Sequence, residues 1–467
     1  MDHLIKILLI NPATENKYCH IKNSFIDNII CKYFNRFFDS SFNIPTHSSC
    51  TTMPPVTLYG LEALVDDSCL VEIIDEQVTP IDFSLTPDLI FITATTTQIN
   101  RAKEISEVFR SKGIKTVIGG VHASSLPQDC QDHFDVVCVG EAEDYLEQLI
   151  ADFINSKLSS QYLNRNPVDM NKVPFYNYEI GNGRYLPFHV INFSRGCSFS
   201  CDFCSIQSTL GGYRTRDVTS IVEQIRKKNS KYIWFPDSTL TANPKKAEEL
   251  FRALKPLKIK WLSQISLNIA QNDHLIDLMA DSGCWLVSIG FESIKKANLK
   301  KSRKSQNNIE VYQGLIKKLH ARNIAIEGNF VFGFDEDDSQ VFQDTADFII
   351  ENGIDLPELY MLTPYPDTPL YDRLYREGRI VDDNWEHYDN SHFIHLPVFQ
   401  PKLMSREELL HGCRKAEMMV YSKFNTFRRF INSRVISLPT LFASYIYAKR
   451  MYYQNNLLPT AKIKCHW

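Results

Sequence analysis

The sequence lacks any uninterrupted apolar run of the roughly 18 residues that a membrane-spanning helix needs. The nearest approach, Val435 to Ala448, is broken by a proline and by serine and threonine residues. A signal peptide is also not expected, because the N-terminal MDHLIKILLINPAT has one lysine before a short apolar segment and no small-residue cleavage site. We therefore expect a cytoplasmic protein whose N-terminus forms a strand.

An excess of charge of either sign is also absent. The chain contains 51 Lys and Arg against 55 Asp and Glu, a formal net charge of −4, so it has no general basic field of the kind that binds nucleic acid. A disulfide framework is not expected from the 12 cysteines, since the cytosol keeps thiols reduced. The cysteines are predicted to be buried apolar residues or ligands.

Length and composition predict a globular protein with more than one core. The chain has 467 residues, of which 44% are hydrophobic and 23% charged, with no internal repeat and no low-complexity segment. A typical domain has about 150 residues, so two or three domains are expected.

The first 155 residues alternate apolar segments with amphipathic ones, which is typical of a parallel sheet covered by helices. Five strands are predicted, at 5–10, 70–74, 89–93, 116–118 and 136–139, with helices at 98–111 and 143–153. The pattern predicts a doubly wound, Rossmann-like α/β domain of the flavodoxin type, in which ligands bind beyond the carboxyl ends of the strands. Residues 14–53 do not fit the pattern and are predicted to be an inserted loop.

Residues 156–185 are polar and contain two prolines, and they are predicted to form a linker. A second alternation over 186–390 predicts strands at 188–193, 232–235, 260–265, 285–289, 325–332 and 358–362, separated by helices. Six units are too few for an eight-stranded barrel, so a partial (β/α)6 barrel is expected. Residues 391–467 are predicted to form a helical C-terminal domain, with helix over 406–449.

Three cysteines directly follow the first strand of the predicted barrel. Cys197, Cys201 and Cys204 have the spacing CxxxCxxC, which chance would produce in about one in a hundred such sequences. Three thiolates can ligate three irons of a four-iron cluster and leave the fourth iron open for a substrate. Zinc is the poorer interpretation, because no Cys or His within the next 60 residues offers a fourth ligand.

This cysteine loop resembles that of the radical S-adenosylmethionine enzymes. The spacing, the aromatic Phe203 before the last cysteine and the position after strand one of a partial barrel all match, and the resemblance covers roughly residues 185–390. Weaker matches follow in the order that the family shows: FPDS at 235–238, Gln264 and Ser266, GFES at 290–293, GNFVFGFD at 328–335 and TPYPDTPL at 363–370. The order of these segments supports the resemblance more than any one of them.

The resemblance implies that Cys197, Cys201 and Cys204 hold a 4Fe-4S cluster whose open iron binds S-adenosylmethionine. The residues implied to contact S-adenosylmethionine are Phe203, Asp237, Ser238, Gln264, Ser266 and Glu292. Asp237 and Ser238 would contact the methionine moiety, and Glu292 would accept hydrogen bonds from the ribose hydroxyls. The alternative for Asp237 and Glu292 is an ordinary solvated acid.

The N-terminal domain resembles the cobalamin-binding domain of cobalamin-dependent radical enzymes. The closest likeness is to the branch with the hopanoid and bacteriochlorophyll methylases and the anaerobic ring cyclase. GGVH at 119–122 and VGEAE at 139–143 carry it, and they imply cobalamin contacts from Gly119, Gly120, His122, Gly140 and Glu141. The DxHxxG signature that supplies an axial histidine is absent, which implies an open or water-ligated lower face of cobalt. The alternative is a domain that has lost its corrinoid.

The implied activity is methylation of an unactivated carbon of a small-molecule or natural-product substrate, through a 5′-deoxyadenosyl radical and methylcobalamin. A radical cyclase, oxidase or rearrangement enzyme would share every motif and stays the alternative. A catalytically silent partner protein is a further hypothesis, which the intact cysteine triad argues against. The implied partners are the substrate, lipophilic in one interpretation, and an electron donor such as flavodoxin or ferredoxin.

Near the C-terminus, residues 421–434 (YSKFNTFRRFINSR) mix basic and aromatic side chains at helical spacing. We expect an ordinary helix that packs its phenylalanine face on the barrel, as amphipathic helices usually do. Contact with a membrane surface or a lipophilic substrate is the less favoured interpretation.

Overall fold

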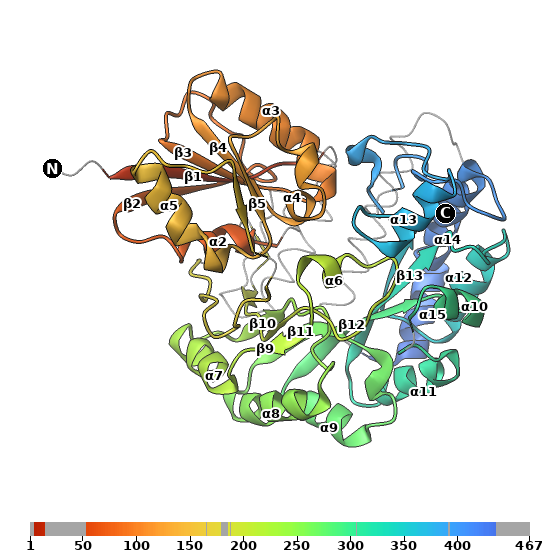
Figure 1. The fold of residues 1–467 in the computed structure, drawn as a ribbon. Helices are drawn as coiled ribbons and strands as arrows, with labels where there is room; N and C mark the ends of the chain where they lie inside the picture. Colours follow the sequence, from red (N-terminus) through yellow and green to blue (C-terminus); the bar gives the residue numbers. More distant parts are fainter. Residues whose placement is uncertain are drawn as a thin grey trace, which may run out of the picture.

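The computed structural model describes residues 4–14, 53–164, 166–178, 185–186, 188–304, 306–390 and 393–435. Figure 1 shows an N-terminal α/β domain, a partial barrel drawn in green to cyan, and C-terminal helices in blue that pack on the barrel. The predicted inserted loop at 14–53 and the predicted helix beyond residue 435 lie almost entirely outside the described residues.

The N-terminal sheet has six parallel strands in the order β2-β1-β3-β4-β5-β6. The strands are β1 (Ile5–Asn11), β2 (Cys69–Asp75), β3 (Leu89–Thr93), β4 (Lys115–Gly119), β5 (Val136–Val139) and β6 (Gln161–Leu163). The helices are α2 (Val56–Glu62), α3 (Ile99–Arg110), α4 (Val121–Ser125) and α5 (Leu146–Ile154). The order 2-1-3-4-5 is that of flavodoxin, so the doubly wound fold is confirmed.

β6 was not predicted from the sequence. It lies in the segment expected to be a linker and pairs in parallel with β5. The strand has three residues, of which the central Tyr162 is buried between two exposed neighbours. So short a segment carries almost no periodicity, and only its pairing partner defines it.

Alternate residues of the central strands supply two separate cores. In β1, Leu8 and Ile10 pack with α3 on one face, whereas Ile7 and Leu9 pack with α2 and α5 on the other. Both faces are covered, so the strands are continuous apolar runs, as in other buried parallel sheets. Their carboxyl ends are the edge at which ligands can reach the backbone.

The second sheet has six parallel strands in the order β14-β13-β12-β11-β10-β7, which confirms the partial barrel. Its strands are β7 (His189–Val190), β10 (Tyr232–Phe235), β11 (Lys260–Ile265), β12 (Cys284–Glu292), β13 (Ala325–Phe332) and β14 (Leu356–Met361). The covering helices are α7 (Val218–Lys227), α8 (Pro244–Leu254), α9 (Asp273–Asp281), α10 (Lys296–Lys301), α11 (Ile309–His320) and α12 (Val341–Glu351). A two-stranded ribbon, β8 (Ser194–Arg195) and β9 (Arg214–Thr215), encloses α6 (Ile206–Thr209). The domain limits given above remain predictions.

The C-terminal helices are α13 (Pro369–Arg376), α14 (Arg406–Val420) and α15 (Lys423–Ser433). The expectation that α15 packs its phenylalanines on the barrel is wrong. Arg429 is the residue that faces inward, 2% exposed, and donates to the carbonyls of Val420, Ile354 and Asp355. Two of these backbone acceptors lie just before β14 and the third ends α14; all three need a donor, and this requirement fixes the rotation of the helix. Within the described residues, none of the helices combines the length and hydrophobicity needed to cross a bilayer.

Replacing Arg429 by alanine should leave these three buried carbonyls without a donor. We expect Arg429→Ala to lower the free energy of unfolding by about 3 kcal/mol in urea titrations. The neighbouring Arg428 is exposed, and Arg428→Ala should cost less than about 0.5 kcal/mol. Equal effects of the two substitutions would contradict the structural role given to Arg429.

Candidate functional site

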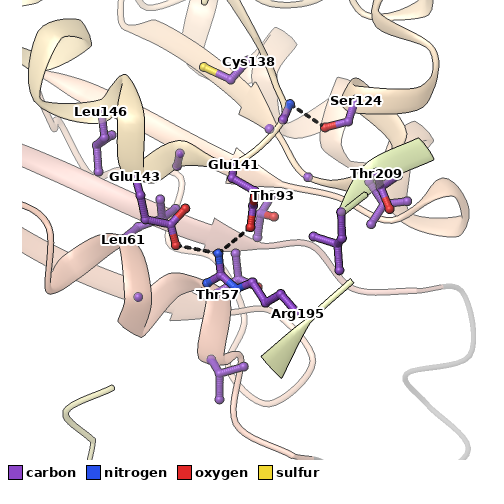
Figure 2. Close-up of a pocket in the computed structure, with 18 of the residues that line it drawn as sticks. Thr57, Leu61, Thr93, Ser124, Cys138, Glu141, Glu143, Leu146, Arg195 and Thr209 are labelled. Carbon is purple, nitrogen blue, oxygen red and sulfur yellow. Dashed lines mark hydrogen bonds and ion pairs between the residues drawn. The ribbon is translucent and has the colours of Figure 1, made fainter. Parts of the chain in front are cut away.

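The carboxyl ends of the two sheets meet at one cavity of about 400 Å³. Figure 2 shows residues of both domains around it. The N-terminal domain contributes Thr93, Gly119, Gly120, Gly140, Glu141 and Glu143 to the rim, and the barrel contributes Ser194, Arg195, Pro236 and Ser238. Of the residues predicted from the sequence, five therefore line one space: Gly119, Gly120, Gly140, Glu141 and Ser238.

The cavity continues between the first sheet and the two helices that cover one of its faces. There it is lined by apolar and small side chains from α2 and the turn after it, α5, β3, β4 and β5: Leu61, Leu64, Phe91, Val117, Cys138 and Leu146. A second cavity of about 380 Å³ shares Gly140, Glu141 and Thr209 with the first. Together they form a large space that is apolar inside the N-terminal domain and polar at the domain boundary.

Two of the predicted glycines are required by the backbone. Gly120 has φ +98°, and a Cβ there would lie 2.8 Å from the Ala94 carbonyl oxygen. Gly140 has φ +87°, and a Cβ would lie 1.6 Å from the Asn164 carbonyl oxygen. The protein's own backbone therefore imposes glycine at both positions, and the rim carries no side chain at either.

His122 does not line either cavity. Its ring is fully buried, its Nε2 lies 3.0 Å from Asp129, and it packs edge-on against Trp385 with the ring centres 5.2 Å apart. This contact joins the N-terminal domain to the segment after α13. A contact of His122 with cobalamin stays a prediction.

Four charged residues join the two domains at the cavity rim, and we call them the interdomain clamp: Glu141, Glu143, Arg195 and Arg214. Figure 2 shows the ion pairs of Arg195 with Glu141 and Glu143. Arg195 Nη1 lies 2.8 Å from each carboxylate, and Arg214 also pairs with Glu141. Glu141 also accepts a hydrogen bond of 3.0 Å from the backbone of Val168. Burial works to lower the pKa of Arg195, but the two carboxylates outweigh it and raise that pKa.

The three cysteines of the predicted cluster lie on the loop between β8 and α6. All are half-buried free thiols. The loop is held by Cys197 N donating to Gly211 O at 3.2 Å, Asp202 N to Ser302 O at 3.0 Å, and Gln207 Nε2 to Phe199 O at 2.8 Å. Burial raises the pKa of Cys204 to about 11 and also raises that of Cys201. Holding three thiolates here therefore requires nearby positive charge or donors.

Two residues that we did not predict supply that stabilisation. Lys304 lies near Cys201 and Cys204, where its charge lowers the pKa of both thiols, and Gln306 Nε2 lies 3.6 Å from Cys201 Sγ. Gln306 Oε1 is buried with no partner among the described residues. The only sequence signal was a basic run directly after GFES, which is indistinguishable from a solvated helix end.

Phe203 and Glu292 both contact this lysine. Lys304 Nζ lies 5.9 Å above the ring of Phe203, which also packs edge-on against Phe334. Glu292 has φ +61° and forms an ion pair with Lys304 in which each side chain is only 11% exposed. Glu292 is thus not a solvated acid, while its contact with a ribose stays a prediction.

Asp237 is 1% exposed and is held by the start of the cysteine loop. Its carboxylate accepts hydrogen bonds from the backbone of Phe193 and from the backbone and hydroxyl of Ser194. Burial raises the pKa of Asp237 to about 7, although these hydrogen bonds oppose the shift. Such a carboxylate positions the loop, and its predicted contact with methionine is not tested by this geometry.

Gln264 and Ser266 lie at the end of β11. Gln264 is exposed, and its carbonyl accepts from Leu240 N at 2.9 Å. The hydroxyl of Ser266 donates to Asn268 at 2.5 Å. Neither residue lines the two cavities described, and their roles stay predictions.

Comparisons with known proteins agree with this architecture. Residues 59–150 match the B12 binding domain, residues 191–349 the Radical SAM superfamily, and residues 368–456 a domain of unknown function (DUF4070). The chain is 31% identical to Bacteriochlorophyllide d C-12(1)-methyltransferase of Chlorobaculum tepidum, over 79% of this chain and 82% of that protein. It is 27% identical to Hopanoid C-2 methylase of Rhodopseudomonas palustris, over 72% and 67%.

Among solved structures, the fold is similar to that of TsrM from Kitasatospora setae. TsrM is a radical S-adenosylmethionine methyltransferase solved with cobalamin and a 4Fe-4S cluster bound. The TM-score is 0.60 at 15% identity, covering 80% of this chain and 78% of that one. At this identity the likeness establishes a shared fold.

The clamp can be tested by removing Glu141. We expect Glu141→Ala to lower the free energy of unfolding by about 3 kcal/mol, because Arg195 and Arg214 then lose a buried partner. Cleavage by trypsin at the domain boundary should also become faster. Glu147 in α5 is exposed, so Glu147→Ala is the control, and no difference between the two variants would exclude the clamp.

Asp237 should make stability depend on pH in a defined direction. The folded protein keeps this proton up to about pH 7, whereas an unfolded aspartate releases it near 3.8. Folding therefore takes up a proton between these values, and the free energy of unfolding falls as pH rises across them. Urea titrations at pH 5 and pH 7 should show a smaller decrease for Asp237→Asn than for the wild type. The exposed Asp132→Asn should leave the decrease unchanged, and an unaltered decrease in Asp237→Asn would refute the assignment.

Proposed function

The chain belongs to the cobalamin-binding radical S-adenosylmethionine enzymes, and from this premise we propose that it transfers a methyl group to an unactivated carbon of a small molecule. The observation that carries the proposal is the shared cavity. The carboxyl ends of a B12-type sheet and of a radical-enzyme barrel line one space, whose rim includes Arg195, two residues before Cys197.

We assign the thiolates of Cys197, Cys201 and Cys204 to a 4Fe-4S cluster. A cluster bound by three thiolates supplies an electron for cleaving S-adenosylmethionine, and a corrinoid supplies a transferable methyl group. The chain's own contribution is to hold three like charges together. Lys304 offsets their negative charge, and Gln306 donates to Cys201.

The cavity fits a corrinoid in shape and polarity. Gly119, Gly120 and Gly140 form an edge without side chains, and the space beyond it between the sheet and α5 is lined by apolar residues. The three glycines would border the corrinoid, and the apolar residues beyond them would contact its apolar parts. The polar second cavity adjoins the same edge and can accept the ring's amide groups.

The proposed substrate is a lipophilic small molecule. The two named relatives are a methyltransferase of a bacteriochlorophyllide and a methylase of a hopanoid. A carbon without acidic hydrogens or leaving groups does not react in a polar methyl transfer. Methylation of such a substrate therefore requires the radical chemistry of the cluster together with the corrinoid. A flavodoxin- or ferredoxin-like electron donor and a cytoplasmic location belong to the same proposal.

Anaerobic reconstitution with iron, sulfide and hydroxocobalamin tests the cofactor assignment. After desalting, the wild type should retain about four irons and one corrinoid per chain. Replacing Cys197, Cys201 and Cys204 together by alanine should abolish iron retention and 5′-deoxyadenosine formation, while corrinoid remains bound in the other domain. Cys69→Ala, a free thiol on β2, is the control.

Methyl transfer itself is tested by product mass. With S-adenosylmethionine labelled in its methyl group, the product should gain one labelled CH₂ over the substrate. A product formed without this gain would replace methyl transfer by cyclisation or oxidation. Iron bound without corrinoid would remove the methyl-donor role of the N-terminal domain.

A further inference from the structure

The outward face of α15 is apolar. Phe424, Phe427 and Ile431 are 70%, 61% and 55% exposed, and Phe424 is the most exposed large apolar side chain among the described residues. Positions i, i+3 and i+7 lie on one side of a helix. Single exposed apolar residues are common, but three in register on one short helix indicate a contact surface.

The inward face of the same helix is polar and cannot be exchanged for the apolar one. Arg429 donates to Ile354 O and Asp355 O at 2.8 Å each, Asn432 Nδ2 to Ile350 O at 2.9 Å, and Ser433 Oγ to Asp355 at 2.5 Å. Turning the helix to bury its phenylalanines would break all these bonds. The apolar face is therefore held outward by the fold.

Cations surround the apolar face. Lys423, Arg428 and Arg434 are exposed, and the guanidinium of Arg428 lies 5.8 Å from the ring centre of Phe424. Residues 418–467 contain eight Lys and Arg and no Asp or Glu, in a chain whose formal net charge is −4. The described part of this stretch, residues 418–435, therefore carries four cations, Lys423, Arg428, Arg429 and Arg434, and no acid.

This charge decides which partner fits. A second copy docked face to face would bring the cations of two α15 helices together, and α15 itself carries no Asp or Glu, so this approach costs energy when water is excluded. The remaining C-terminal residues of the chain carry no acid either. A surface with anionic headgroups above an apolar layer complements both the cations and the apolar side chains.

We propose that the face of α15 formed by Phe424, Phe427 and Ile431, with Lys423, Arg428 and Arg434, binds the surface of an anionic lipid bilayer. The three apolar side chains enter the boundary between headgroups and acyl chains, and the cations contact the headgroup phosphates. Because α15 is bonded to Ile354 and Asp355, at the amino end of β14, the contact leaves the cavity at the carboxyl ends of the strands uncovered.

Co-sedimentation of the full-length protein with vesicles tests this. Vesicles of equimolar phosphatidylglycerol and phosphatidylcholine should bind the wild type at least tenfold more tightly than pure phosphatidylcholine vesicles do. The variant Phe424→Ser/Phe427→Ser/Ile431→Ser should lose at least tenfold in affinity. Lys423→Gln/Arg428→Gln should reduce the preference for anionic vesicles.

The matched control removes three exposed apolar side chains that are scattered over the surface. Leu70, Tyr375 and Val381 are 56%, 67% and 49% exposed, and the variant Leu70→Ser/Tyr375→Ser/Val381→Ser should bind like the wild type. Unfolding curves that match the wild type exclude loss of the fold in the α15 variant.

Three results would overturn the proposal. The first is failure of the wild type to bind anionic vesicles, and the second is equal binding by the α15 variant and the control variant. The third is a dimer, seen by light scattering, that the α15 substitutions dissociate, because it would assign the face to a second copy. None of these outcomes depends on the cofactors, so the test is independent of the proposed methyl transfer.

Discussion

The two α/β domains depend on a small group of charges that are nearly removed from water. Glu141 is 9% exposed and pairs with arginines of both strands of the ribbon around the cysteine loop, Arg195 on β8 and Arg214 on β9. A partly buried ion pair requires a defined geometry, and loss of one partner leaves a buried charge that is costly. Two apolar surfaces, in contrast, can shift along each other without such a cost. This clamp therefore fixes the orientation of one domain on the other, and the shared cavity exists only in that orientation.

The second constraint is the gathering of three thiols in a half-buried loop. Burial disfavours the thiolates, and their mutual repulsion adds to that penalty. The chain counters with one cation and one amide, Lys304 and Gln306, both from the segment that follows α10. Glu292 in turn holds Lys304, so the end of β12 controls the electrostatics of a loop about 90 residues earlier in the chain. The site is built from side chains that support one another across the barrel.

The sequence predicted those features whose signal is local. Apolar runs such as Ile5–Asn11 identify buried parallel strands because both faces of the sheet are covered. The spacing of the three cysteines predicts an iron–sulfur cluster without knowledge of any other residue. It missed features defined by distant partners. β6 exists through its pairing with β5, Lys304 is set apart from neighbouring lysines only by its position beside Cys201, and α15 faces outward because carbonyls before β14 require Arg429. Helical periodicity shows that a helix has an apolar face. It does not show which face of the helix packs against the rest of the protein.

The clamp residue Arg195 and the first cysteine, Cys197, are separated by a single glycine. Two residues of extended chain span at most about 7 Å. The guanidinium that pairs with the N-terminal domain is therefore coupled to the first thiol, and the two groups move together. If the two domains moved apart, either the ion pairs of the clamp would break or the cysteine loop would move with the N-terminal domain. The covalent link between Arg195 and Cys197 therefore restricts the distance between the two proposed cofactor positions. Any ligand that enters the cavity must fit that distance.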